Sequence, residues 1–276
     1  MIQKTLSFFF VILLSLCLGA NLAAAAPLRL EAHSAILMNM TTGRVLFTQN
    51  AGVPIQPASI TKVLTLYLAD EAIREGRVRL EDPVKISRRA WRTGGSKMFV
   101  EAGNEIQLEE LLKGMAVVSA NDASVAVAEH VGGNVERFVA QMNRKARAIG
   151  MTRSVFKNPN GLPAKGQTTT ARDMAILARE YLRRFPEALE LHSQQEFSYR
   201  DITHHNRNVL LTSYPNADGL KTGWVRKAGY HLVATAKRGD TRLIAVVMGA
   251  KNPAIRARET ARLLDEGFAM AGQGEV

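Results

Sequence analysis

The sequence has a single cysteine, and that residue lies within its first twenty positions. Cys17 falls in an apolar run, Leu6–Leu18, which follows Lys4 and precedes small residues of the Ala-x-Ala type before Pro27. This three-part pattern is typical of a secretory signal peptide, because the apolar run is too short for a comfortable membrane span. We therefore predict a signal peptide over residues 1–26 and a periplasmic or secreted mature protein. An uncleaved membrane anchor is the alternative interpretation.

The mature chain would then contain no cysteine at all. This excludes disulfides, a thiol nucleophile and a cysteine-bound zinc site, so an exported protein of this kind depends on its core for stability. The six histidines are scattered, with no His-Glu-x-x-His sequence for zinc and no Gly-x-Ser-x-Gly turn beside them. His204, His205 and His231 are therefore interpreted as surface or packing residues, and neither a metal ion nor another cofactor is expected.

Acidic residues are few compared with basic ones. The chain has 36 Lys and Arg against 25 Asp and Glu, a net charge of +11 and a pI near 10.0. Such a charge favours an anionic partner. Nucleic acid is not expected, because the protein is predicted to be exported and its basic residues lack interleaved aromatic residues. A polyanionic cell wall or membrane surface fits both facts better.

The order of hydrophobic patterns predicts an α+β fold. A hydrophobic content of 46% with 22% charged residues is that of a globular protein. Helical spacing dominates the middle of the chain and returns near its end, over 108–119, 122–132, 135–150 and 254–270. Strand-like runs flank the middle region at 34–40, 44–49, 229–239 and 240–250. The terminal strands must therefore pair with each other across the helical insertion.

One short stretch, "PASITKVLTLYLADEA", combines a hydroxyl and an amine. Residues three apart are neighbours on a helix, so Ser59 and Lys62 could meet as a nucleophile and its base. Such a pair also arises by chance, and the chain has a second one, Ser154 with Lys157. That second pair lies in a polar loop rich in Pro and Gly. Other parts of the sequence must therefore decide whether Ser59 is catalytic.

Two further elements support Ser59. The stretch "VVSANDA" places Ser119 and Asn121 at a helix junction, and "DGLKTGWVRKAGYHLVATA" places Lys221-Thr222-Gly223 at the start of a strand. Ser-x-x-Lys, Ser-x-Asn and Lys-Thr-Gly, in that order, form the signature of the penicillin-recognising serine enzymes.

The chain resembles the serine D-alanyl-D-alanine carboxypeptidases, which are the low-molecular-mass penicillin-binding proteins. The resemblance runs from about Ala32 to Met270 and is carried by "PASITKVLT", "GSKMFVEAG", "SANDASVAVAEHVGG", "FKNPNGLP", "TTTARDMAILAREYL", "HNRNVLL", "DGLKTGWVRKAGYHLVATA" and "RLIAVVMGAK". It implies a catalytic domain over residues 27–276. Within it, a five-stranded antiparallel sheet is flanked by helices, with an inserted mostly helical region beside it, as in serine β-lactamases and penicillin-binding transpeptidases.

The resemblance also implies a role for individual residues. Ser59 would be the nucleophile, with its own backbone N–H in the oxyanion hole, and Lys62 would be the base. A lysine base must lose its proton near neutral pH, which requires burial and a second cation such as Lys221. Ser119 would pass a proton to the departing D-alanine, and Asn121 would hold the substrate amide.

Further residues would hold the substrate. Thr222 would bind the terminal carboxylate, Gly223 would let the substrate run beside the strand, and Trp224 would give the second oxyanion N–H. Arg256 is a candidate for the carboxylate region, and a solvated arginine at a helix start is the alternative. Many family members have His or another polar residue where this chain has Trp224, followed by a hydroxyl residue instead of Val225. Substrate contacts at these two positions are therefore in question.

The predicted function is a D,D-carboxypeptidase that acts on peptidoglycan stem peptides and is acylated by β-lactams. A D,D-endopeptidase that cuts crosslinks, a β-lactamase and a catalytically silent wall-binding protein are the alternatives. The chain ends at "AMAGQGEV" without the amphipathic anchor found in many family members, so no membrane anchor is expected at the C-terminus.

Overall fold

The computed structural model describes residues 28–272 and 274. The predicted signal peptide, residues 1–26, lies outside the described residues. Among the residues that are described, no helix combines the length and the apolar character needed to cross a membrane.

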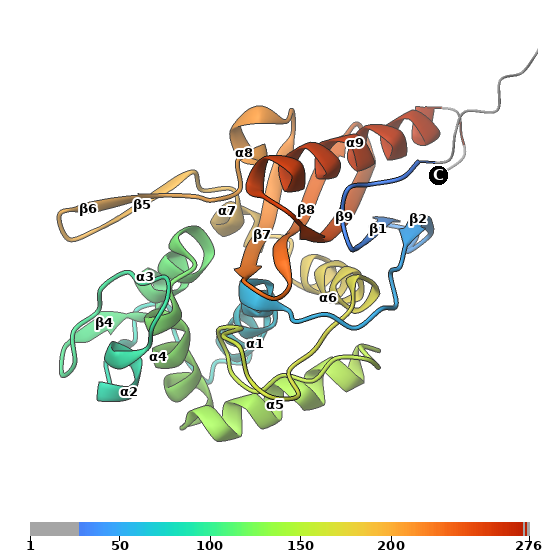
Figure 1. The fold of residues 1–276 in the computed structure, drawn as a ribbon. Helices are drawn as coiled ribbons and strands as arrows, with labels where there is room; N and C mark the ends of the chain where they lie inside the picture. The colour runs from blue at the N-terminus through green and yellow to red at the C-terminus, as the bar shows by residue number, and fades with distance from the viewer. Residues whose placement is uncertain (1–27, 273, 275–276) are drawn as a thin grey trace, which may run out of the picture.

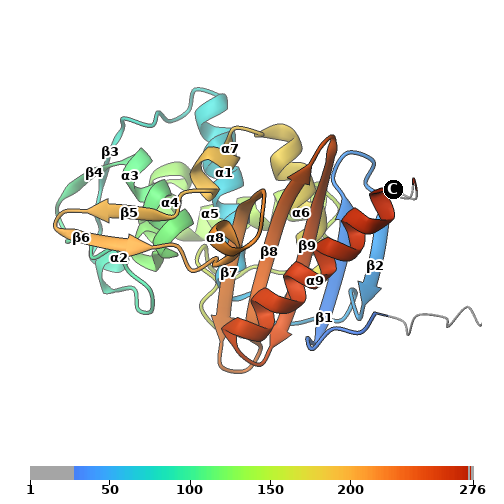
Figure 2. The ribbon, with the colours of Figure 1, turned by 90° about the horizontal axis from the view of Figure 1, so that it is seen from above.

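A five-stranded antiparallel sheet joins the two ends of the described chain (Figures 1 and 2). In spatial order its strands are β2 (Val45–Gln49), β1 (Ser34–Asn39), β9 (Thr241–Ala250), β8 (Gly229–Arg238) and β7 (Ala217–Val225). Strand β1 pairs with β9 from Ser34↔Met248 to Asn39↔Leu243. The first strand therefore closes on the last one, and the predicted α+β fold is confirmed.

Both faces of this sheet are buried, which explains its continuous apolar strands. Along β1, Ala35 and Leu37 pack with residues of helix α9 (Pro253–Gly272), which lies diagonally across the sheet in Figure 2. Ile36 and Met38, between and after them, belong to the core on the opposite face. Successive strand side chains point to opposite faces, so a strand that is apolar at every position must lie between two layers.

The insertion between β2 and β7 carries most of the helices. They are α1 (Lys62–Arg74), α2 (Arg88–Arg92), α3 (Leu108–Lys113), α4 (Asn121–Gly132), α5 (Val135–Ala148), α6 (Ala171–Arg184), α7 (Ala188–His192) and α8 (Leu210–Ser213). Two short turns, the 3₁₀ turn η1 (Ala58–Thr61) and the π-helical turn η2 (Gly114–Val118), precede α1 and follow α3. Two small two-stranded antiparallel sheets complete the insertion. One pairs β3 (Pro83–Lys85) with β4 (Glu105–Gln107), and the other is the hairpin of β5 (Glu196–Tyr199) and β6 (Ile202–His205).

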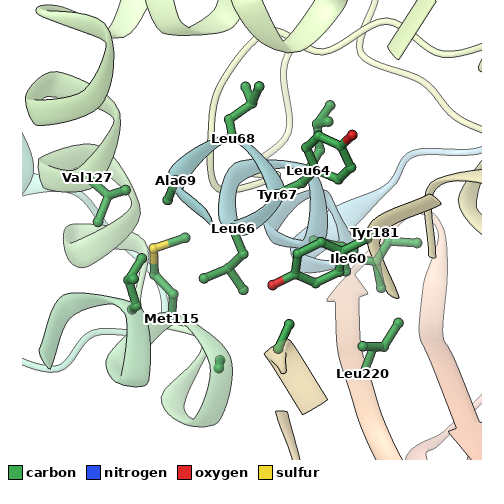
Figure 3. Close-up of a cluster of buried hydrophobic side chains, with 14 of the residues drawn as sticks. Ile60, Leu64, Leu66, Tyr67, Leu68, Ala69, Met115, Val127, Tyr181 and Leu220 are labelled. Carbon is green, nitrogen blue, oxygen red and sulfur yellow. The ribbon is translucent and has the colours of Figure 1, made fainter. Parts of the chain in front are cut away.

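Helix α1 is buried on nearly every side. Figure 3 shows side chains that leave it in several directions, among them Leu64, Leu66 and Leu68, while Met115 and Tyr181 approach from neighbouring segments. A helix enclosed in this way cannot shift without opening cavities in the core. Cavities are costly, since truncating a single large buried side chain destabilises a protein by about 2–5 kcal/mol. The residues at the start of α1 are therefore held in a fixed position.

The structure differs from the sequence prediction in several places. The expected helix over 108–119 breaks into α3 and η2, and it ends at Ser119 in a left-handed conformation with φ 65°. The hairpin of β5 and β6 was not predicted. The expected strand start at Lys221 is wrong, because β7 already begins at Ala217. Lys221 therefore lies in the middle of a strand.

Candidate active site

Ser59 and Lys62 meet at the junction of η1 and α1. Ser59 lies within the 3₁₀ turn, and Lys62 is the first residue of the α-helix. The Lys62 side chain is fully buried, and its Nζ lies 3.1 Å from Ser59 Oγ. The contact predicted from their spacing is therefore present.

Two further acceptors surround the Lys62 amine. Nζ donates to Asn121 Oδ1 at 2.7 Å and to the carbonyl oxygen of Asn160 at 2.9 Å. A neutral amine has two N–H donors and one lone pair. Since these two acceptors take both donors, the lone pair of a neutral Lys62 points toward the Ser59 hydroxyl. This is the arrangement that proton removal from Ser59 requires.

The surroundings favour this neutral form. Burial lowers the pKa of Lys62 well below its usual value, and the positive charges of Lys221 and Arg207 lower it further, while Asp122 opposes them. Lys221 is itself buried, and burial together with Arg207 and Arg256 lowers its pKa to about 7. The site therefore concentrates cationic side chains in a position that favours both a neutral base and an anionic ligand.

An open cavity of about 850 Å³ lies in front of this pair. Seven of the nine predicted site residues line it, namely Ser59, Ser119, Asn121, Thr222, Gly223, Trp224 and Arg256. The other two, Lys62 and Lys221, are buried, and Nζ of Lys62 reaches Ser59 and Asn121. The structure thus brings together residues that are up to 197 positions apart in the sequence.

Ser119 is one of the residues that line the cavity. Its side chain is buried, and among the described residues its Oγ has no hydrogen-bond partner. A buried polar group without a partner costs about 1–3 kcal/mol. Ser119 also has a left-handed backbone, which is uncommon for residues other than glycine. An unpartnered hydroxyl and an uncommon backbone at one position point to a role with a ligand rather than in packing.

Asn121 has both ends of its amide occupied. Its Oδ1 accepts from Lys62, and its Nδ2 donates to the carbonyl oxygen of Gly94 at 2.7 Å. In this structure Asn121 therefore holds the base and the segment around Gly94. The predicted contact between Asn121 and a substrate amide stays a prediction.

Gly223 allows β7 to approach the nucleophile closely. A Cβ atom at this position would lie 3.1 Å from the backbone nitrogens of Ser59 and Ile60 and from the Cβ of Ala58. Nearly all observed Cβ contacts are longer than this, so any other residue would push the strand away from η1. The glycine of Lys-Thr-Gly thus sets the width of the cleft between the strand and Ser59.

Arg256 is not a solvated helix-start arginine, which was one of its two interpretations. Its side chain is only 5% exposed, and its Nη2 donates to the carbonyl oxygen of Arg207 at 3.0 Å. Its Nε has no partner among the described residues, and burial lowers the pKa of the guanidinium to about 10. A buried cation without a carboxylate is costly, so this position favours an anionic ligand.

Two functional contacts were not predicted. Arg207 lines the cavity and lowers the pKa of both lysines, and the carbonyl of Asn160 accepts from Lys62. Both residues lie in segments that carry the family resemblance, "HNRNVLL" and "FKNPNGLP". Sequence position alone could not indicate that their chain segments reach the site.

The ring of Trp224 lies at the mouth of the cavity. It is 53% exposed and packs against Tyr230, with the ring centroids 5.8 Å apart. Both residues line the cavity. Because oxyanion donation would use the backbone N–H of Trp224, the ring itself stays free to contact a substrate.

Ser154, the competing nucleophile, has a structural role. Its Oγ donates to Asp173 Oδ2 at 2.6 Å and shares a hydrogen bond with Thr169 Oγ1 at 2.8 Å. Lys157 is exposed, and neither residue lines the cavity. In the part of the chain that the structure describes, there is also no group of three or more His, Cys, Asp and Glu that could hold a metal ion.

A family model and the curated relatives of this chain carry the same description. Residues 21–252 match the peptidase S11 family, described as D-alanyl-D-alanine carboxypeptidase. The chain is 40% identical to D-alanyl-D-alanine carboxypeptidase DacC of Escherichia coli and 42% identical to DacF of Bacillus subtilis, over 91% and 86% of its length. These alignments span 64% and 62% of the two relatives, so the chain covers less than two thirds of each.

Solved structures with a similar fold include penicillin-binding proteins. Penicillin-binding protein 5 of Haemophilus influenzae superposes with a TM-score of 0.86 at 38% identity, over 88% of this chain and 72% of that one. Penicillin-binding protein D2 of Listeria monocytogenes, in its ampicillin-bound form, gives 0.81 at 28% identity, over 88% of this chain and 99% of that one. With the three motifs gathered around one cavity and a family match over most of its length, the chain belongs to the D-alanyl-D-alanine carboxypeptidase family of S11 peptidases.

Proposed function

We propose that this protein is a serine D,D-carboxypeptidase that removes the terminal D-alanine from peptidoglycan pentapeptide stems. The observation that carries the proposal is the buried Lys62 amine, 3.1 Å from Ser59 Oγ, with its two donors engaged elsewhere and its pKa lowered. Family membership supports the choice of substrate. The relatives named DacC and DacF are D-alanyl-D-alanine carboxypeptidases.

Acylation would begin with proton transfer from Ser59 Oγ to neutral Lys62. The Oγ would then attack the carbonyl carbon of the penultimate D-alanine, and the backbone N–H groups of Ser59 and Trp224 would stabilise the resulting oxyanion. Collapse of this intermediate breaks the peptide bond and leaves an ester on Ser59. Ser119 would deliver the proton that the leaving D-alanine amine needs, since this residue lines the cavity and its buried hydroxyl has no partner in the described chain.

The terminal carboxylate of the substrate would bind between β7 and the start of α9. Thr222 and Arg256 both line the cavity there, and Lys221 and Arg207 add positive charge nearby. An arginine holds a carboxylate with two parallel hydrogen bonds when both are oriented. The buried guanidinium of Arg256 would therefore gain the anionic partner that it lacks.

Hydrolysis of the ester would complete the cycle, with Lys62 and Ser119 activating water. A β-lactam would acylate Ser59 in the same way, as its ampicillin-bound form indicates for the Listeria relative. The segment 152–170, which contributes Asn160 and part of the cavity lining, contains neither Asp nor Glu. Glu187 and Glu190 line a separate cavity, and Glu180 pairs with Arg183. These positions argue against the β-lactamase alternative.

A D,D-endopeptidase is the second candidate. The exposed Trp224 ring beside Tyr230 offers an aromatic surface at the mouth of the cavity, where the larger leaving group of a crosslinked stem could pack. The catalytically silent wall-binding protein fits less well. Such a protein would gain nothing from a buried lysine that points at a serine hydroxyl.

The test is mass spectrometry of products from two purified substrates, an uncrosslinked pentapeptide muropeptide and a crosslinked dimer. We expect loss of one D-alanine from the first substrate and little change in the second. Cleavage of the dimer alone would favour the endopeptidase. Ser59→Ala is the control and should be inactive on both, whereas Ser154→Ala should retain activity.

We also propose that residues 1–26 are a signal peptide, that residues 27–276 form the catalytic domain and that the protein acts in the periplasm or outside the cell. The N-terminal sequence pattern and the peptidoglycan substrate support this location. N-terminal sequencing of protein recovered from the periplasm tests it. A sequence that starts at Met1 would contradict the proposal.

A further inference from the structure

One continuous part of the chain carries no acidic residue. From Arg137 to Arg172 there is no Asp or Glu, while eight positions are Lys or Arg. Seven of these basic side chains are exposed, and we call them the basic face: Arg137, Arg144, Arg147, Arg153, Lys157, Lys165 and Arg172. The eighth, Lys145, pairs with the buried Glu71.

The exposed charges are not neutralised by neighbours. Elsewhere on the molecule basic residues commonly form ion pairs, for example Arg200 with Glu101 and Arg238 with Asp265. No member of the basic face has an ion pair among the described residues. Asp173, the first carboxylate after this stretch, is 3% exposed and is held by Ser154 and the backbone N–H of Arg153.

The members of the basic face share one region of the surface. Arg137, Arg144 and Arg147 follow the exposed side of α5, which runs along one edge of the molecule in Figure 1. Asn143 exchanges two hydrogen bonds with the backbone of Phe156, so α5 is fixed to the segment that carries Lys157.

The remaining members of the basic face lie in the segment after α5 and at the start of α6. Lys157 lies over Gly166, beside Lys165, since a Cβ at Gly166 would be 3.6 Å from Lys157 Cε. Arg153 Nη1 donates to the carbonyl of Gly52. The backbone N–H of Arg172 donates to the carbonyl of Ala51, the residue before Gly52. The segment after α5 is thus tied at both ends to neighbouring parts of this surface.

The basic face continues into the proposed catalytic cavity. Gly161, Leu162 and Pro163, which lie between Lys157 and Lys165, line the cavity that contains Ser59. The carbonyl of Asn160, in the same segment, accepts from Lys62. An anionic polymer that lies on the basic face would therefore be placed next to the nucleophile.

We propose that the basic face binds peptidoglycan strands through the free carboxylates of neighbouring stem peptides, so that the enzyme prefers polymeric substrate. This proposal rests on the proposed function for its substrate class. Positive charge along a surface raises the local concentration of an anionic substrate and its association rate. The effect depends on salt, because the Debye length falls from about 10 Å at 0.1 M to about 3 Å at 1 M.

An anionic membrane is the competing partner, and the surface fits it less well. Interfacial binding normally combines basic side chains with large apolar side chains that enter the lipid. Of the exposed large hydrophobic residues in the described chain, only Val155 lies between Arg137 and Arg172. The face therefore offers charge with little apolar area for insertion.

The test compares two variants with equal change in net charge. The first, Arg144→Glu with Arg147→Glu and Lys157→Glu, reverses the basic face. The control, Arg44→Glu with Arg88→Glu and Lys237→Glu, reverses three exposed basic residues elsewhere. At low salt we expect kcat/KM on purified sacculi to fall about tenfold in the first variant only. Both variants should release D-alanine from a monomeric pentapeptide at the parent rate, which also shows that they are folded.

Binding is measured separately from activity, by co-sedimentation of Ser59→Ala proteins with sacculi and with vesicles of anionic phospholipid. We expect sacculus binding that the basic-face variant loses and that about 1 M salt abolishes. Equal loss in the control variant, or unchanged sacculus binding in the basic-face variant, would overturn the proposal. Binding to vesicles but not to sacculi would assign the face to a membrane instead. Absence of D-alanine release by the parent protein would reject the proposed function without deciding the binding result.

Discussion

Replacing Asn121 by Asp places a negative charge beside the proposed base. Asn121 Oδ1 lies 2.7 Å from Lys62 Nζ, and both side chains are buried. A unit charge at that distance attracts the lysine ammonium by about 6 kcal/mol at an effective dielectric constant of about 20. This energy corresponds to a factor of about 10⁴ in the protonation equilibrium of Lys62. The substitution changes hardly any volume, so its main effect is electrostatic.

The expected result is a base that stays protonated at neutral pH. General base catalysis contributes about 10²–10⁴ to rate, so we expect acylation of Asn121→Asp by a β-lactam to fall at least a hundredfold at neutral pH. The rate should recover in part as the pH rises, because Lys62 then loses its proton. Stopped-flow measurement of acylation with a fluorescent penicillin, across the pH range in which the protein stays folded, gives both quantities.

Asn121→Ala is the matched control. It removes the contacts of Asn121 with Lys62 and with the carbonyl of Gly94, and it adds no charge. Its acylation rate should fall without a shift of the pH profile to higher pH. If Asn121→Asp kept the parent pH profile and acylation rate, Lys62 would not be the base whose protonation controls acylation, and the electrostatic reasoning would be refuted.

Three further predictions follow from the geometry. Penicillin should acylate Ser59 and persist there for minutes while pentapeptide turns over; recovery of activity within seconds after removal of excess penicillin would instead favour a β-lactamase. Arg256→Met should raise Tm, because it removes a buried unpaired cation, and lower kcat/KM on pentapeptide at least about tenfold; an unchanged kcat/KM would remove Arg256 from the carboxylate site. Burial lowers the pKa of His231 from 6.5 to about 4, and the neutral ring donates to the Gln56 carbonyl and accepts from the N–H of Gly249. The unfolded state therefore binds the extra proton between these pH values, so the free energy of unfolding falls as the pH drops from 6.5 to about 4. In urea unfolding, the parent should lose about 2 kcal/mol more stability than His231→Gln between pH 7 and about pH 5. An equal loss in both proteins would contradict this assignment.

The sequence by itself determined the fold class and the contact between Ser59 and Lys62. Strand patterns at both ends required pairing across the insertion, and β1 does pair with β9. The i, i+3 spacing of Ser59 and Lys62 is a local property, so it indicated their contact without knowledge of the fold. The order of the three motifs indicated which serine to choose, and Ser154 indeed has its hydroxyl engaged by Asp173.

Only the tertiary structure decided what surrounds that pair. Asn121 and Asn160 follow Lys62 by 59 and 98 positions, and no local pattern indicates that one would accept through its side chain and the other through its backbone. The burial of Arg256 could not be predicted from the sequence either, because an arginine at a helix start is exposed unless another segment covers it. Here the segment that contains Arg207 covers it. Side-chain burial and backbone hydrogen bonds depend on contacts between distant segments, and these contacts lower the pKa of Lys62.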